Sequence, residues 1–117
     1  MKQNIILEKT FGFAVKVIKL VQCLQSKNKE FVLSKQVLRS ATSIGANTEE
    51  AIAAQSSADF LSKLSIARKE ARETSYWLRL IKASELYNCS DLITEANEII
   101  RIITSIIMTT KQKEAKP

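Results

Sequence analysis

Histidine is absent from the 117-residue chain, and glycine, proline and cysteine are scarce. Without histidine, the sequence excludes Ser-His and Cys-His nucleophile pairs, the Glu-x-x-His motifs of di-iron bundles and most zinc sites. Two glycines cannot form a glycine-rich phosphate-binding loop. We therefore expect a protein that is not an enzyme and that uses no metal and no cofactor.

The single proline is Pro117, and so few turn-forming residues argue against a sheet, whose strands need many tight turns. Cys23 and Cys89 lie far apart and match no metal or redox spacing, so we expect two free thiols in a reducing cytoplasm. Charged residues interrupt the apolar run near the N-terminus, and no uncharged run approaches the length of a bilayer span. The prediction is a cytoplasmic protein without a membrane partner.

What the chain does contain is helical periodicity, because apolar residues recur at spacings of three and four over four segments. The first segment spans residues 4–26, and the second runs from about 34 to 54. The third begins after a corner at 55–59, and the fourth follows a turn at 86–91. Four helices joined by short corners predict an all-α, antiparallel, up-down-up-down bundle. We expect one domain over residues 1–113 and a charged tail at 114–117 that frays.

Polar residues mark where the predicted helices begin. Ser34 is expected to cap the second helix, because its hydroxyl can accept a hydrogen bond from a free backbone N–H. Ser56 and Asp59 have the spacing of a capping box at the start of the third helix. Asn88 or Ser90 is expected to cap the fourth.

The second helix passes through an unusual stretch, SATSIGANTEEA, at residues 40–51. Gly45 is a poor helix former, yet the apolar spacing continues through it, so the helix is expected to be unbroken. Small side chains here let a neighbouring helix approach closely, and the third helix offers small residues at matching positions. Close packing is therefore the expected role of Gly45.

Four polar residues flank the apolar seam of the second and third helices, namely Asn47, Glu50, Glu70 and Glu73. A carboxylate at the edge of a core needs a hydrogen-bonding partner, which an asparagine side chain or Arg39 can supply. The pattern predicts a structural polar network that holds the helices in register. The alternative is a functional pocket, including a site for a hard cation at the three glutamates.

Basic residues form stripes on two helices of this chain, whose net charge is +6. The stripes consist of Arg68, Arg72, Arg79 and Lys82 on the third helix and of Lys9, Lys16 and Lys19 on the first. Guanidinium groups form bidentate hydrogen bonds with phosphates, so these residues are candidates for binding RNA or DNA. Aromatic residues interleave little with them, so we expect binding to depend on backbone charge. The alternative is a solvated face that binds no nucleic acid.

The first and fourth helices are apolar over a wider arc than one bundle core requires. On the fourth helix the surplus residues are Ile93, Ile100, Ile102 and Ile107. Exposed apolar surface is costly, so we expect it to form a subunit or partner interface. The alternative is that the bundle buries these side chains by itself.

Three motifs follow one another within residues 38–81: Ser-Ile-x-Ala-Asn-x-x-Glu at 43–50, Ser-x-x-Asp-Phe at 56–60 and Ala-x-x-Glu-x-x-Glu-Thr at 67–74. In these motifs the chain resembles a bacterial family of four-helix-bundle proteins, first noted as open reading frames within intervening sequences of 23S ribosomal RNA genes. The resemblance implies a homo-oligomer, and specifically a pentamer, because members of this fold assemble into five-fold barrels.

The stripes and the resemblance together predict a non-enzymatic accessory or scaffold protein that binds RNA or DNA through basic helix faces. The alternative function is a protein–protein interaction module whose basic charge is incidental.

Overall fold

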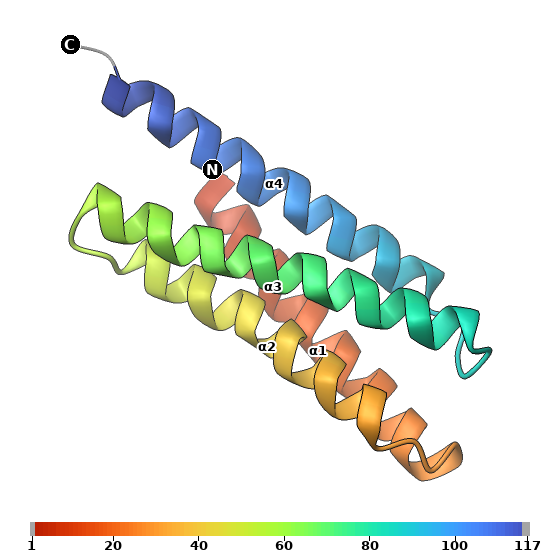
Figure 1. Cartoon of the computed structure of the whole chain (residues 1–117). Coiled ribbons are helices and arrows are strands. Elements are labelled where there is room, and N and C mark those ends of the chain that lie inside the picture. The colour runs from red at the N-terminus through yellow and green to blue at the C-terminus, as the bar shows by residue number, and fades with distance from the viewer. Residues whose placement is uncertain (1, 116–117) are drawn as a thin grey trace.

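The computed structural model describes residues 2–115 and contains four helices within that range. They are α1 (Lys2–Lys27), α2 (Val32–Ile52), α3 (Ser57–Ala83) and α4 (Ser90–Ala115). Each helix packs against the next, and α4 packs against α1, so the order around the bundle is α1–α2–α3–α4 (Figure 1). The result is a rod of 56 × 21 × 21 Å, which confirms the predicted all-α bundle.

The helices follow the predicted segments to within a few residues at most ends. At the C-terminus, α4 continues through Glu114 and Ala115, the first two residues of the tail that was expected to fray. Lys116 and Pro117 lie outside the described residues. Between residues 2 and 115, no helix combines the length and the hydrophobicity that crossing a bilayer would require.

All four helices contribute to one aliphatic core. Fully buried members of this core include Ile6, Phe13, Val37, Ile44, Leu64, Leu78, Ile99 and Ile103. Where α2 meets α3 the buried residues are small, and Ala41 and Ala71 are both 0 % exposed. Small side chains at that seam allow the two helices to pack closely.

The surplus apolar width of α4 is taken up within the bundle. Ile107 is 2 % exposed, and Ile93, Ile100 and Ile102 lie partly buried against the core. The bundle itself thus covers these α4 isoleucines, as in the alternative expectation that no subunit or partner interface is needed to bury them.

α1, in contrast, keeps apolar side chains outside the bundle. Phe11, Val15 and Ile18, which we call the α1 apolar face, are 66 %, 38 % and 39 % exposed. Their spacing of four and three residues places them on one side of the helix. Lys9 and Lys16 reach across to α4, and a turn of about 100° per residue places Phe11 and Ile18 on the other side of α1, beside α2.

The start of α2 differs from the prediction, because Ser34 lies inside the helix. Its hydroxyl donates to the carbonyl oxygen of Glu30 at 2.9 Å and accepts from Gln25 at 3.2 Å. The Glu30 carboxylate instead accepts hydrogen bonds from the backbone N–H groups of Val32, Leu33 and Ser34, at 3.1, 2.9 and 2.8 Å. The predicted Ser34 cap was therefore wrong: a longer side chain, placed earlier, reaches the free N–H groups of the first turn.

The other two caps agree with the prediction. The Ser56 hydroxyl accepts a hydrogen bond from the Asp59 N–H at 3.1 Å, at the start of α3. At the start of α4, the side-chain oxygen of Asn88 accepts from the Ser90 N–H at 3.3 Å.

The Glu30 cap makes the stability of the bundle depend on pH. Partial burial raises the pKa of Glu30, but the N–H groups of Leu33, Ser34 and Val32 together hold that pKa below its ordinary value. A carboxyl group with a depressed pKa stabilises the fold above its unfolded pKa, and this stabilisation is lost as the pH falls through its folded pKa. Glu30→Gln is therefore expected to lower the free energy of unfolding by about 1 kcal/mol at neutral pH.

Urea unfolding at neutral and at acid pH would check this prediction, with Glu49→Gln on exposed helix surface as the control. The Glu30 variant should differ from the parent protein at neutral pH only. An equal loss at both pH values would contradict a charge-dependent cap.

The sequence predicted that Gly45 would pack against α3, but in the structure Gly45 faces α1. A methyl group on Gly45 would lie 3.6 Å from the β-carbon, hydroxyl and carbonyl oxygen of Thr10, which is ordinary van der Waals contact. The glycine is thus not required for the approach of the two helices, and its backbone has no positive φ that would favour glycine.

Gly45→Ala is accordingly expected to stabilise the protein by about 0.5–1 kcal/mol, because alanine loses less backbone entropy in a helix. Gly12→Ala is the matched control, since a methyl group there meets nothing within 4 Å. Thermal unfolding should show similar gains for both. Destabilisation by Gly45→Ala alone would mean that the α1–α2 contact does need glycine.

Candidate nucleic-acid interface

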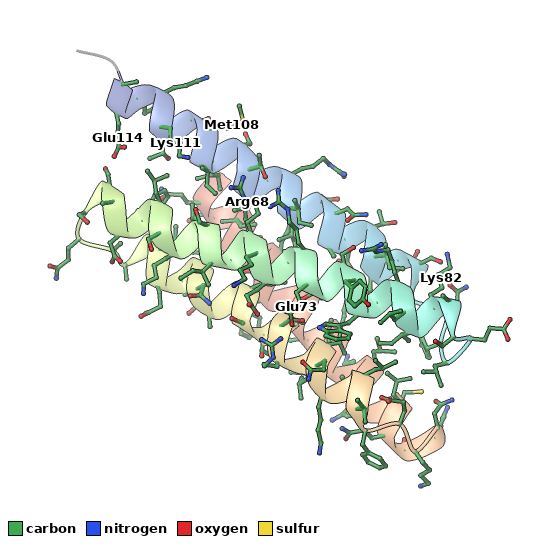
Figure 2. All side chains as sticks on the ribbon, viewed as in Figure 1. Arg68, Glu73, Lys82, Met108, Lys111 and Glu114 are labelled. Carbon is green, nitrogen blue, oxygen red and sulfur yellow. The ribbon has the colours of Figure 1, made fainter. Side chains whose placement is uncertain are left out.

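α3 carries opposite charges on two sides. Glu70 and Glu73 lie toward α2, whereas Arg68 lies toward α4, and Figure 2 shows Arg68 and Glu73 on opposite edges of the helix. Residues 68, 72, 75 and 79 follow the spacing of one helical face. One helix thus carries an acidic side next to α2 and a basic side next to α4.

The acidic side of α3 is neutralised by Arg39 of α2. Its guanidinium donates to Glu70 at 3.2 Å and also pairs with Glu73. The Trp77 indole N–H donates to the same Glu73 oxygen at 3.0 Å. Two carboxylates, one guanidinium and one indole therefore form a polar network between α2 and α3, which includes Glu70 and Glu73 from the predicted set of four.

The other two residues predicted for this network do not join it. The Asn47 amide donates to the carbonyl and hydroxyl oxygens of Ser43, at 2.9 and 3.0 Å, within α2. Glu50 is exposed, and its carboxylate makes no hydrogen bond or ion pair with the residues described. Further inside, a separate contact joins α2 and α3, in which the Thr74 hydroxyl donates to that of Ser40 at 2.7 Å.

A cation site at the three glutamates finds no support in this arrangement. Arg39 already occupies the space between Glu70 and Glu73, and Glu50 stands apart. Within residues 2–115, no group of three or more His, Cys, Asp or Glu side chains is arranged to hold a metal ion.

The basic side of α3 contacts α4 only through neutral groups. Arg68 donates to the Thr104 hydroxyl at 3.4 Å, and the Ser75 hydroxyl donates to Asn97 at 3.5 Å. Arg79 donates to the backbone carbonyl of Ser75 at 3.3 Å. Arg72 and Lys82 are exposed. In the described part of the chain, none of these four cations is within ion-pair distance of a carboxylate.

Arg101 extends this surface onto α4. It lies on one helical face with Asn97 and Thr104, the two residues through which α4 contacts the basic side of α3. Its side chain is exposed. The sequence analysis missed Arg101 because it stands alone among isoleucines, with no stripe on its own helix. We call Arg68, Arg72, Arg79, Lys82 and Arg101 the α3–α4 basic surface.

The predicted basic stripe of α1 is arranged differently. Lys9 pairs with Glu98, and the Lys16 amine lies 2.9 Å from a Glu95 oxygen, so both reach α4. The hydrogen bond and charge of Lys9 lower the pKa of Glu98. Lys19, by contrast, makes no ion pair with residues 2–115. The structure thus pairs two of the three α1 candidates with carboxylates of α4, and the charge of Arg101 also contributes to the lowered pKa of Glu98, the partner of Lys9.

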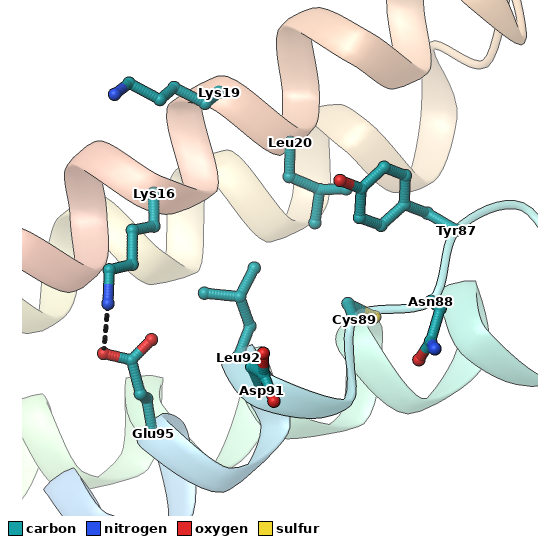
Figure 3. A pocket seen from close by; sticks show the side chains of 9 residues that line it. All are labelled: Lys16, Lys19, Leu20, Tyr87, Asn88, Cys89, Asp91, Leu92 and Glu95. Atoms are coloured by element: carbon teal, nitrogen blue, oxygen red, sulfur yellow. Dashed lines mark hydrogen bonds and ion pairs between the residues drawn. The ribbon is translucent and has the colours of Figure 1, made fainter.

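A cavity of about 380 Å³ lies between α1 and the start of α4 (Figure 3). Leu20 and Leu92 form its apolar part, and the Lys16–Glu95 pair spans one side. The free thiol of Cys89 is buried there and donates to the Leu78 carbonyl at 3.1 Å, and burial raises its pKa. Side chains of both signs line this cavity, so it does not match a polyanion.

The fold places this protein in the class of all-α four-helix bundles. Residues 2–105 match the family described as 23S rRNA-intervening sequence protein. The chain therefore belongs to that family, as the sequence motifs indicated.

One solved structure similar to this chain is that of a protein of unknown function from the S23 ribosomal protein family of Bacteroides thetaiotaomicron VPI-5482. The two are 47% identical over 92% of this chain and 99% of that one, with a TM-score of 0.90. A search of curated proteins finds no match.

Proposed function

We propose that this protein is a non-enzymatic cytoplasmic accessory or scaffold protein that binds RNA or DNA through the α3–α4 basic surface. The observation that supports this proposal is the clustering of unpaired cations along one helix face. Arg68, Arg72, Arg79 and Lys82 follow one another on α3, and none of them lies within ion-pair distance of a carboxylate among the described residues. Their charge is therefore available to a polyanion.

The geometry of α3 suits a phosphate backbone. Arg68 and Lys82 are fourteen residues apart in one helix, which corresponds to about 21 Å. Guanidinium groups spaced along such a rod can each contact a phosphate, and Arg101 widens the surface across α4. Contacts of this kind position a nucleic acid without reading its sequence, and they weaken as salt rises.

The test is fluorescence anisotropy with a labelled structured RNA and a duplex DNA over a salt series. Replacing Arg68, Arg72 and Arg79 together with alanine is expected to weaken binding at least about tenfold, and to reduce the salt slope by about two to three. A triple alanine variant of exposed lysines elsewhere, Lys27, Lys35 and Lys113, removes the same charge and serves as the control.

Equal losses in both triple variants would mean that net charge, not the α3–α4 basic surface, attracts the nucleic acid. If the parent protein binds neither probe near physiological salt, the alternative function stands, a protein–protein interaction module with incidental charge.

We further propose that copies of the chain associate through the α1 apolar face. Phe11, Val15 and Ile18 form a continuous apolar stripe that water would otherwise contact. The resemblance to five-fold members of this fold suggests a pentamer. Since the α1–α2 side of the bundle is opposite the α3–α4 side, such an assembly would leave each basic surface open. Repeated weak sites then bind one polymer with greater avidity.

A further inference from the structure

Tyr76 is an aromatic side chain in the middle of the α3–α4 basic surface. It follows Arg72 by four residues and precedes Arg79 by three, so the three share one side of the helix. The ring is 48 % exposed, and its hydroxyl makes no hydrogen bond with residues 2–115. The hydroxyl group therefore contributes no hydrogen bond to the described fold, and the contacts of this tyrosine are those of its ring.

Neighbouring side chains hold the Tyr76 ring in place. The Trp77 ring meets it edge to face, with centroids 5.2 Å apart and an interplanar angle of 65°. Trp77 is in turn hydrogen-bonded to Glu73, which Arg39 also binds. The Arg79 guanidinium carbon lies 5.8 Å from the centre of the tyrosine ring. The polar network toward α2 therefore supports a half-exposed ring with the Arg79 guanidinium over it and with Arg72 one turn earlier on the same side of the helix.

We propose that Tyr76 stacks on an unpaired base, so that the α3–α4 basic surface prefers single-stranded nucleic acid. This inference depends on the proposed function and adds the kind of strand that is bound. Arg72 and Arg79 are seven residues apart, or about 10 Å along the helix, with the ring between them. Phosphates on the two arginines would place a base over the ring, and a base is free to stack there only when it is not within a duplex.

The experiment compares four fluorescein-labelled probes by anisotropy at one salt concentration: single-stranded DNA, single-stranded RNA, an abasic DNA strand of the same length, and duplex DNA. Tyr76→Ala is expected to weaken binding to both single strands about tenfold, equivalent to about 1.4 kcal/mol. It should change binding to the abasic strand and the duplex less than about twofold, because neither offers a free base face. Tyr76→Phe keeps the ring and should bind like the parent protein.

Tyr87→Ala removes another half-exposed tyrosine, which lies outside α3, and it should have no effect on any probe. An equal loss on the abasic strand would overturn the inference, because stacking needs a base. No loss in Tyr76→Ala, while the triple arginine variant still binds weakly, would overturn stacking and leave the proposed function intact. If the parent protein binds none of the four probes, the proposed function fails as well.

Discussion

Phe13→Ala should lower the free energy of unfolding by about 3–5 kcal/mol, the largest single effect we expect in this protein. Phe13 is 1 % exposed and is among the largest fully buried side chains of the core. Its removal loses the transfer free energy of the ring and leaves a cavity among Ile, Leu and Val side chains that fill only part of it. Urea or thermal unfolding at several protein concentrations would measure the loss.

Phe11 is the matched control, since it lies two residues away on the same helix and is 66 % exposed. Phe11→Ala should cost little in the isolated bundle. If the α1 apolar face joins copies of the chain, its effect should depend on protein concentration and disappear on dilution. Light scattering should then show a smaller assembly for Phe11→Asp combined with Ile18→Asp. A parent protein that is monomeric at micromolar concentration would contradict the proposed association. A small loss of unfolding free energy for Phe13→Ala would contradict the assigned core.

Arg39→Met should have the second largest effect. We expect this substitution to lower the free energy of unfolding by about 2–3 kcal/mol. The variant leaves the Glu70 carboxylate, whose side chain is 12 % exposed, without its cation at the edge of the core. Arg39 itself is 53 % exposed, so solvent screens the pair and the loss falls below that of a fully buried pair. Urea unfolding would measure it, and Trp77 fluorescence would report on the Glu73 contact.

Two comparisons make this prediction specific. Adding Glu70→Gln to Arg39→Met should recover part of the stability, because a neutral amide is easier to leave unpaired than a carboxylate. Lys16→Met breaks an ion pair of which both partners are more exposed, and it should cost less than about 1 kcal/mol. Equal, small losses for Arg39→Met and Lys16→Met would contradict a structural role for the network.

The helices were predictable because their periodicity and most of their caps depend on spacing along one segment. The third helix repeats its apolar positions over its whole length, and the Ser56 cap depends on a residue three positions away. Because carboxylates beside a seam need partners, the sequence offered either an asparagine side chain or Arg39 to Glu70 and Glu73, and the structure shows that Arg39 is the partner. By spacing alone, Glu50 could not be distinguished from Glu70 and Glu73 as a member of the network. Only the packing of the helices shows that Glu50 is exposed.

Faces on a single helix were less predictable. Phe11 and Phe13 both fit apolar spacings, since α1 has two neighbouring apolar stripes of similar composition. Periodicity identifies the stripes, but the positions of the neighbouring helices decide which stripe is buried. The Glu30 cap was missed for a related reason. Glu30 lies in the corner before α2, and the path of the chain through that corner decides whether its carboxylate reaches the backbone N–H groups of the first turn.

By itself, the sequence determined the number of helices, their approximate ends, the family and the arginine stripe of α3. Only the tertiary structure decided which cations are neutralised. The Lys16–Glu95 contact joins residues 79 positions apart, and Arg39 reaches Glu73 across 34 positions. Charge pairs of this kind depend on how the helices lie beside one another. The periodicity of a single helix carries no information about that arrangement. The same packing leaves Arg68, Arg72, Arg79 and Arg101 on one open side.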